Sequence, residues 1–432
     1  MPSTNEPVDF EVIVVGAGIA GCVAAHELAR LGHEVLLVER AAEPGAKSLS
    51  GGVLYTRVMD HVWPDFASHA PVERHITRNS LMFLNEGSRV TIDYADDRLA
   101  EPVNAVSVLR APLDAWLAER CTEAGVTVMS GVLVEELLFD GERVAGIRAG
   151  EDVLHTRVVI AADGINSFLC RSAGIRAAEP AANLALGIKS VVGLSRAVLE
   201  ERFHLIGDEG VAYAVVGQPT HGLPGGGFLY TNRCSVSVGV VVRLDELAAS
   251  TRSSVELHDR FLAHPAIHQL LAGGEPLEYG CHLIAEGGRT MQHDLTRPGL
   301  VVVGDAAGLT LNTGLTLRGM DLAAGSAIVA ANVVHAHLVT CADDVLAGYP
   351  DALDRSFVGR DMRTFAKAPH FLDNDRIYGP YGRLLADVLH DAYDLDTSPR
   401  RHLVRSGLAA VRRSPMSLRQ LARDAALAAK DL

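Results

Sequence analysis

Short apolar runs separated by glycine-rich turns open the chain. Residues 10–15 form an apolar run rich in β-branched side chains, a helical pattern continues to Leu31, and a second apolar run covers 34–38. An apolar run without polar alternation is typical of a strand buried on both faces of a parallel sheet. The order strand, helix, strand therefore predicts the beginning of a doubly wound α/β domain.

Further along the chain the spacing of apolar positions changes. It is close to period two over 81–94, 211–217 and 227–243, which predicts antiparallel strands with one buried face. Between these regions the pattern predicts a helix at 111–124 and strands at 127–134, 144–148 and 153–161. A short apolar strand at 300–303 precedes a long alanine-rich helix at 319–339, and the chain beyond Pro350 has a helical pattern. Because the two kinds of sheet alternate along the chain, we expect one lobe to be inserted into the other.

Composition narrows the class of protein. With 432 residues, 48% hydrophobic and 21% charged, the chain is long and apolar enough for a full core, which excludes a disordered or collagen-like protein. The net charge of −14 argues against nucleic acid as a partner. We see no secretory leader and no long uncharged apolar run, so we expect a cytoplasmic protein with at most peripheral membrane contact. The six cysteines are widely separated, so we expect free thiols and no bound metal or iron–sulfur cluster.

A glycine motif follows the first strand. Gly16, Gly18 and Gly21 have the spacing G-x-G-x-x-G, with Ala20 before the last glycine, and Glu39 ends the second strand. The first glycine permits a tight turn, the second lets a pyrophosphate approach the backbone, and the third allows close helix packing. A carboxylate at position 39 accepts hydrogen bonds from ribose hydroxyls and repels a 2′-phosphate, which disfavours NADP. The alternative is a glycine-rich turn without a ligand.

Two later strands also end in an acidic residue. Asp163 and Gly164 follow the apolar run 158–162, and Gly304 and Asp305 follow 300–303. A carboxylate at the end of a parallel strand can hold a ribityl hydroxyl of a flavin. For Asp305 the alternative is a helix N-cap.

These three motifs, in this order, resemble the FAD-dependent proteins that share the p-hydroxybenzoate hydroxylase fold. Within that group the chain is most similar to the FixC-like dehydrogenases and the electron-transfer-flavoprotein:ubiquinone oxidoreductases, which are related to geranylgeranyl reductases. The segments that carry the resemblance are 45–52, 64–66, 70–75, 109–111, 116–117, 207–211, 282–284, 286–288 and 318–323. The resemblance implies FAD as cofactor, a Rossmann-like three-layer FAD domain with a parallel sheet, an inserted mostly antiparallel substrate domain, and a helical C-terminal segment. The expected ranges are 9–80, 105–180 and 281–345 for the FAD domain, 81–104 and 181–280 for the substrate domain, and 346–432 for the helical segment.

The resemblance also assigns roles to residues. It implies that Gly16, Gly18 and Gly21 contact the pyrophosphate, Glu39 the ribose, Arg110 the phosphate or adenine side, and the backbone of Val134 the adenine. Asp163 and Gly164 would lie near the flavin, Asp305 would hold the ribityl chain, and Asn312, Gly314 and Leu315 would pass its pyrimidine edge. Amides at the N-terminus of the helix that follows Leu315 could stabilise the reduced ring. The remaining expected cofactor contacts are Ala20, Arg40, Lys47, Ser50, Gly51, Gly52 and Gly304. The alternative for Arg110 is a surface ion pair, and for Lys47 a solvated loop lysine.

The chemistry of the flavin is less directly encoded. Hydroxylases of this fold usually place a His and then a Pro after the segment 304–307, and this chain has neither there. We therefore expect a dehydrogenase or reductase that moves a hydride or electrons between a small organic substrate and an external carrier through flavin N5. An FAD-dependent aromatic-type monooxygenase and a non-catalytic dinucleotide sensor remain the alternatives.

Candidate partners and catalytic groups follow from the same comparison. The chain has no second G-x-G-x-x-G after a strand, so NAD(P)H would bind only transiently, and a ferredoxin or electron-transfer flavoprotein is the expected carrier. The lack of iron–sulfur ligands puts direct quinone reduction in doubt. His282 is a candidate proton donor beside N5, and Tyr230 is expected to line the substrate pocket with Tyr213, Gln218 and Phe228. A structural role is the alternative for each of them. The basic segment 400–432 could contact anionic lipid or an acidic carrier, or pack on the acidic body of the protein.

Overall fold

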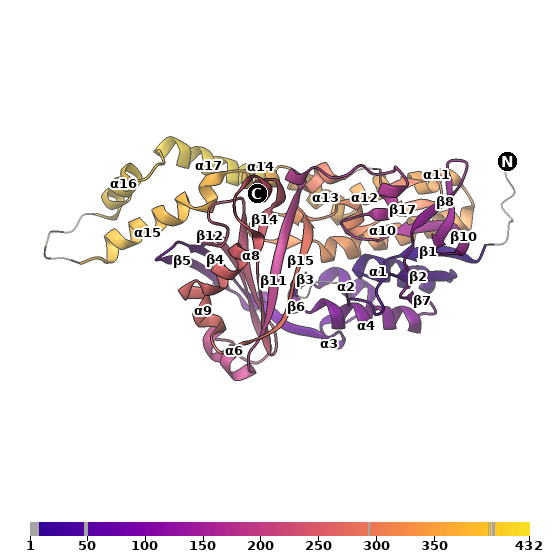
Figure 1. The fold of residues 1–432 in the computed structure, drawn as a ribbon, viewed down its shortest axis with the longest axis horizontal. Helices are drawn as coiled ribbons and strands as arrows, with labels where there is room; N and C mark the ends of the chain where they lie inside the picture. Colours follow the sequence, from indigo (N-terminus) through magenta and orange to yellow (C-terminus); the bar gives the residue numbers. More distant parts are fainter. Residues whose placement is uncertain (1–7, 47–50, 293, 396, 398, 400–401) are drawn as a thin grey trace.

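The described part of the molecule has two large sheets, a two-stranded hairpin, the helices that pack on them, and a set of C-terminal helices (Figure 1). The computed structural model describes residues 8–432 except 47–50, 293, 396, 398 and 400–401. In Figure 1 the eight-stranded sheet lies toward the end that holds the N-terminus, the nine-stranded sheet lies in the middle, and α15 and α16 project at the opposite end. The site lies where the two sheets meet, as described below.

The eight-stranded sheet has the order β16-β17-β10-β1-β2-β7, with β9 pairing β10 and β8 pairing β9. The pairs β1–β2, β1–β10, β10–β17 and β2–β7 are parallel. Val12, Ile13 and Val14 of β1 have no exposed surface, as expected for a strand covered on both faces. The strands are β1 (Phe10–Val15), β2 (Val35–Glu39), β7 (Thr127–Ser130), β8 (Glu136–Asp140), β9 (Arg143–Ala149), β10 (Asp152–Ala161), β16 (Thr296–Arg297) and β17 (Leu300–Val302).

Helix α1 packs against two other helices in this half of the molecule. The three helices are α1 (Ile19–Arg30), α4 (Arg110–Glu123) and α10 (Met320–Thr340). Among the described residues, α10 is the helix whose length and apolar composition would allow it to cross a membrane, but 61% of its most apolar stretch is buried inside the protein. Its small side chains, such as Ala324, Ala327 and Ala331, are buried, and the helix packs closely against α1. We interpret α10 as a core helix.

The nine-stranded sheet has the order β15-β11-β14-β13-β12-β4-β6-β3, with β5 beside β4. Its pairs are antiparallel except β4–β12, which is parallel, so the expectation of antiparallel strands is wrong for that pair. The predicted strand at 227–243 is a hairpin of two strands. The strands are β3 (Gly52–Tyr55), β4 (Val72–Leu84), β5 (Arg89–Ala95), β6 (Ala105–Val108), β11 (Leu184–Gly193), β12 (Glu209–Gly217), β13 (Gly225–Thr231), β14 (Ser235–Arg243) and β15 (Glu275–Ala285).

Alternation along the strands gives this sheet two different faces. In β14, Val236, Val238, Val240 and Val242 belong to a core that also contains Phe203 of α6 (Arg196–Phe203) and Phe261 of α8 (Ser254–Ala263). The intervening Val241 lines the cavities described below. Successive side chains of a strand point to opposite faces, so one face of the sheet is filled by helices and the other forms the wall of the site.

Several strands were not predicted from the sequence, or were predicted with different bounds. β4 begins at Val72 and not near Leu81, and β11 and β15 were not predicted. The first part of β4 contains Arg74, whose guanidinium is buried and donates to the backbone oxygens of Asn232, Gly207 and Glu209. A buried charged residue hides the alternation on which strand prediction depends. The domain ranges stay predictions. The nine-stranded sheet already includes β3, which begins at Gly52, within the range 9–80 that was expected to belong to the FAD domain.

An ion pair joins the last C-terminal helix to an earlier residue of the chain. Asp424 of α17 accepts hydrogen bonds from the Nε and Nη2 atoms of Arg376 at 2.6 and 2.7 Å, and Ser417 and Gln420 form a capping box at the start of α17. The ion pair joins an acidic residue of the tail to an arginine of the same helical segment, so the role of the basic side chains of 400–432 stays a prediction. The helices are α11 (Asp343–Ala347), α12 (Tyr349–Arg355), α13 (Phe357–Thr364), α14 (Ala368–Leu372), α15 (Pro380–Tyr393), α16 (Leu403–Arg413) and α17 (Leu418–Asp431).

The remaining described elements are short and connect the sheets. They are α2 (Arg57–Val62), α3 (Phe66–His69), α5 (Phe168–Ser172), α7 (Leu244–Ala249), α9 (Pro265–Leu271), β18 (Leu311–Asn312), β19 (Leu317–Arg318), and the 3₁₀ turns η1 (Asp97–Leu99), η2 (Ala181–Asn183), η3 (Gln218–Thr220), η4 (Gly288–Met291), η5 (Gly304–Ala307) and η6 (Asp375–Tyr378).

Candidate FAD site and substrate cavity

The glycine motif forms one end of a cavity of about 390 Å³. Gly16 has φ +107°, and a Cβ there would lie 2.4 Å from the carbonyl oxygen of Ala162, so only glycine fits. A Cβ on Gly21 would lie 1.8 Å from the carbonyl oxygen of Gly16, which fits the expected close packing at the start of the helix. Gly21 does not line the cavity, and the contact with the pyrophosphate that the resemblance implies for it stays a prediction. The nearest atom to a Cβ on Gly18 would be Nη2 of Arg110, at 3.6 Å. The second glycine therefore leaves open space for a pyrophosphate next to a guanidinium.

Glu39 is held beside this turn by two backbone amides. Its Oε2 accepts from the amide of Ala17 at 2.9 Å and its Oε1 accepts from the amide of Ala41 at 2.8 Å. Each carboxylate oxygen has a further lone pair, so both can still accept from ribose hydroxyls. Arg40 and Val134 line the same end of the cavity.

Arg110 begins α4 and forms an ion pair inside the cavity. Its Nε and Nη2 atoms donate to Oδ1 and Oδ2 of Asp114 at 3.0 and 2.8 Å. Both residues line the cavity, and Asp114 is buried. The pair is therefore part of the site and not the surface ion pair that the sequence left open. A guanidinium fixed in this way can still direct its remaining N–H groups to a phosphate.

The two strand-end carboxylates lie in the wall of the cavity. Asp163, after β10, accepts from the amide of Leu169 at 3.0 Å through Oδ2, while its buried Oδ1 has no partner among the described residues. Asp305 lies in η5, well before the start of α10, so it is not the cap of that helix. Burial raises the pKa of both carboxyls, and Arg110 and His282 oppose this effect on Asp305. A buried acceptor without a partner is costly, and the hydroxyl groups of a flavin side chain would supply donors.

The far end of the cavity is formed by the nine-stranded sheet. Lys189 of β11 lines it, and its Nζ donates to the carbonyl oxygen of Gly51 at 2.7 Å. Burial and the nearby charge of Arg110 lower the pKa of Lys189 to about 7. Lys189 was not among the residues predicted from the sequence, although a single lysine in the apolar run 184–193 was a usable signal. His282 of β15 also lines this end, and burial lowers its pKa, with Asp305 opposing, so its ring is neutral at pH 7.

A second, larger cavity of about 1320 Å³ opens beside the first. Both are lined by five side chains at the junction, most of them apolar: Val53, Phe228, Tyr230, Val241 and Leu317. Phe228 and Tyr230 are stacked, with ring centroids 5.0 Å apart. Tyr213 also lines the second cavity, whereas Gln218 lines neither. The predicted pocket residues are thus brought together, except Gln218.

Asn312, Gly314 and Leu315 line the second cavity and not the first. They lie in the β18–β19 hairpin, and α10 begins only at Met320, after Gly319. The helix N-terminus that could stabilise a reduced flavin therefore lies at Gly319 and Met320, which line the first cavity, and not at Gly314 and Leu315.

The structure gathers most of the residues predicted from sequence. The first cavity is lined by Gly16, Gly18, Ala20, Glu39, Arg40, Gly51, Gly52, Arg110, Val134, Asp163, Gly164, Asp305, His282 and Tyr230. Gly304 packs behind it, and its amide donates to Oγ of Ser326 at 3.0 Å. Lys47 and Ser50 lie outside the described residues. The individual roles of all these residues stay predictions.

Comparison with known proteins decides the family. Residues 9–220 match the model of an FAD binding domain, and 185–284 match a model described as ETF-QO, ubiquinone-binding. The chain is 43% identical to the probable electron transfer flavoprotein-quinone oxidoreductase YdiS of Escherichia coli K12, over 91% of this chain and 92% of that protein. It is 40% identical to Protein FixC of the same strain, over 92% and 94%. The chain belongs to the FixC family.

This family assignment confirms several sequence predictions. The chain is an FAD-dependent oxidoreductase that works with an external electron carrier, and FAD is its cofactor. The fold is shared with a geranylgeranyl bacteriochlorophyll reductase-like protein from Thermoplasma acidophilum, with TM-score 0.69 and 19% identity over 96% of this chain and 99% of that one. PqsL, a probable FAD-dependent monooxygenase from Pseudomonas aeruginosa, has the same fold with TM-score 0.59 and 20% identity over 85% and 98%. FAD supplies reversible redox chemistry, and the chain supplies its binding, its orientation and the adjoining cavity.

Proposed function

We propose that this FixC family member passes electrons from reduced FAD to a quinone held in the second cavity. The observation that carries the proposal is the junction at Phe228 and Tyr230, where the FAD cavity opens directly into a large, mainly apolar space. A quinone ring with an apolar tail matches such a space. The match of 185–284 to a ubiquinone-binding model supports the same interpretation, because residues of β11 to β14, which lie in or next to that range, line the cavity.

The doubt about quinone reduction came from the missing iron–sulfur ligands. A cluster is one way to bring electrons to the flavin, but the flavin can receive them from another protein. We propose that an electron-transfer flavoprotein or a ferredoxin is the donor, and the relatives named as electron transfer flavoprotein-quinone oxidoreductases support the first of these. NAD(P)H in transient contact is the other candidate.

A quinone with a long tail resides in a membrane, so the acceptor has to be reached from the membrane surface. We propose a cytoplasmic protein that touches the membrane peripherally. Apolar side chains near the turn between α15 and α16 are strongly exposed, among them Tyr393 at 81% and Val404 at 74%. Arg405 and Arg412 follow on α16, and basic residues beside exposed apolar ones favour contact with anionic lipid.

The proposal is tested with the flavin reduced in advance. The purified protein with FAD is reduced anaerobically with dithionite and mixed with decylubiquinone, and flavin reoxidation is followed by absorbance. We expect fast reoxidation by decylubiquinone and slow reoxidation by oxygen. Rapid reaction with oxygen and none with decylubiquinone would overturn the proposal and favour the monooxygenase alternative.

A further inference from the structure

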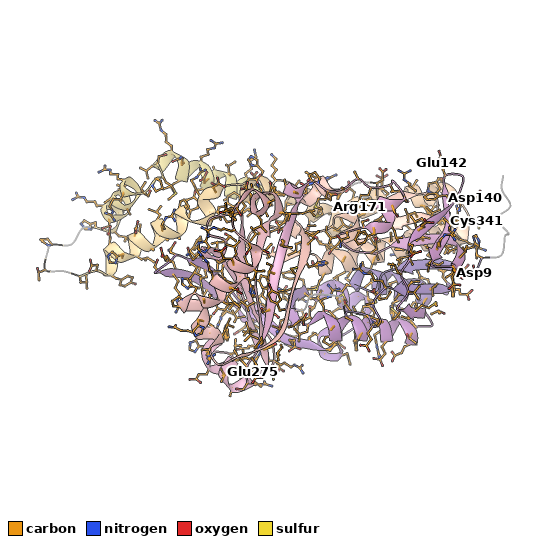
Figure 2. All side chains as sticks on the ribbon, viewed as in Figure 1. Asp9, Asp140, Glu142, Arg171, Glu275 and Cys341 are labelled. Carbon is orange, nitrogen blue, oxygen red and sulfur yellow. The ribbon has the colours of Figure 1, made fainter. Side chains whose placement is uncertain are left out.

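One acidic residue of the second cavity stands apart from the other lining groups. Glu286 directly follows β15, and its side chain lines the cavity. Glu275, labelled in Figure 2, begins the same strand and so lies at its opposite end. The amide of Glu286 donates to the carbonyl oxygen of Asn183 at 2.8 Å, which fixes its backbone. Among the described lining residues the other acidic side chain is Asp373, and it is paired with Arg243.

A side-chain network connects Glu286 to the hairpin beside the flavin cavity. Nδ2 of Asn312 donates to both carboxylate oxygens of Glu286, at 3.0 and 3.3 Å. Oδ1 of Asn312 accepts from the amide of Gly314 at 2.8 Å, so the orientation of the Asn312 amide group is set by the hairpin itself. Leu317, on the second strand of this hairpin, lines both cavities. The carboxyl is therefore held in a defined position next to the junction.

Charged, titratable and other polar groups on three elements interact with Glu286. Arg243 of β14 is engaged by Asp245, Glu246 and Asp373, and Asn312 of β18 donates to the carboxylate. Tyr378 of η6 donates its hydroxyl to the carbonyl oxygen of Leu372 at 2.6 Å, and burial raises its pKa. His370 of α14, which also lines the cavity, is largely exposed, and its Nδ1 lies 3.9 Å from Oδ2 of Asp431.

The balance of these effects brings the pKa of Glu286 close to neutral pH. Burial raises the pKa of Glu286 to about 7, against the opposing effects of Asn312 and Arg243. Tyr230, at the junction, keeps its proton because burial raises its pKa far above neutral pH. Glu286 is thus the described acid of this wall that can change its protonation state near pH 7.

We propose that Glu286 is a catalytic residue that donates protons to the oxygens of the bound quinone. The inference rests on the proposed function. Reduction of a quinone consumes two electrons, which come from the reduced flavin, and two protons. In each proton transfer the O–H bond of Glu286 breaks as an O–H bond of the quinone forms. The carboxylate left behind takes its next proton from water at the cavity mouth, because a charged group in an apolar wall is costly.

Three variants test the inference. Glu286→Gln keeps the shape and the acceptor for Asn312 but has no acidic proton, and Glu286→Asp restores an acid. Glu275→Gln is the control, because it makes the same chemical change at the exposed far end of the strand. Each protein, loaded with FAD and reduced with dithionite, is mixed over a range of pH with decylubiquinone or with ferricyanide, which accepts electrons without protons.

With decylubiquinone we expect the wild-type rate to fall about tenfold per pH unit above pH ~7, because the acid form is lost. Glu286→Gln should be about 100-fold slower and independent of pH, Glu286→Asp should recover part of the rate, and Glu275→Gln should match the wild type. Rates with ferricyanide should be the same in all four proteins. A Glu286→Gln protein with the rate and pH profile of the wild type would overturn the inference.

A second readout does not depend on turnover. In pH-difference infrared spectra of the oxidised protein, the wild type should show a protonated-carboxyl C=O band that titrates near pH 7, and Glu286→Gln should lack it. If the wild type reduces ferricyanide but not decylubiquinone, the proposed function fails, and the infrared titration decides separately whether Glu286 exchanges a proton. Persistence of the band in Glu286→Gln would refute the role of this residue.

Discussion

Replacing Gly18 by alanine separates binding of FAD from folding. A Cβ at this position would meet only Nη2 of Arg110, at 3.6 Å, which is an ordinary van der Waals distance. The backbone at Gly18 has φ −79° and ψ −175°, which alanine adopts without strain. We therefore expect the free energy of unfolding of the FAD-free protein to change by less than ~1 kcal/mol.

The same methyl group occupies the space through which a pyrophosphate approaches the backbone. We expect the Kd for FAD to rise at least tenfold, which corresponds to a loss of ~1.4 kcal/mol of binding free energy. Gly16→Ala and Gly21→Ala are the matched controls. Their Cβ atoms would lie 2.4 and 1.8 Å from backbone oxygens, so these variants should destabilise the protein even without FAD.

The measurement uses protein from which FAD has been removed. Thermal unfolding followed by circular dichroism gives the Tm of each variant, and titration with FAD followed by flavin fluorescence gives the Kd. The reasoning would be refuted if Gly18→Ala bound FAD with the wild-type Kd, or if its Tm fell as far as that of Gly16→Ala.

Three further predictions concern other parts of the structure. Asp305→Ala should lower the flavin content of the purified protein, because a carboxylate in the wall of the FAD cavity is lost. The ratio of flavin to protein absorbance measures the flavin content, and an unchanged ratio would contradict the assignment of Asp305 to the FAD site. In Glu286 the folded-state pKa of about 7 lies above the ordinary 4.5, so its contribution to stability is full below pH 4.5 and is lost as pH rises through 7. The stability of Glu286→Gln relative to wild type should thus increase from pH 4.5 to pH 8 by at most ~3 kcal/mol, and a difference independent of pH in denaturant titrations would disprove this. Arg74→Met should lower the free energy of unfolding by ~3 kcal/mol, because the buried guanidinium that joins three backbone carbonyl oxygens is lost. Arg74→Lys should rescue only part of this loss in urea titrations; full rescue by lysine would count against the role of the fork geometry.

Local sequence signals were sufficient for the FAD half of the molecule. The glycine spacing, the apolar strands β1 and β10, and the acidic residues Glu39, Asp163 and Asp305 each depend on short-range backbone geometry. A parallel sheet places the carboxyl ends of its strands on one edge, so residues from distant parts of the chain were predicted to meet, and most of them line one cavity.

The tertiary structure alone decided the substrate side. Strands β4, β11 and β15 carry buried or cavity-facing polar residues that disturb the apolar alternation, and the parallel pairing of β4 with β12 is set by packing between distant segments. Lys189 meets Gly51 across 138 positions of sequence, and Glu286 meets Asn312 across 26. Sequence by itself determined that this protein binds a dinucleotide, because that signal resides in short motifs, and the family resemblance of those motifs implied that the dinucleotide is FAD. The cavity beside the flavin, and the charges of Lys189 and Glu286 within it, depend on burial, which exists only once the two sheets have come together.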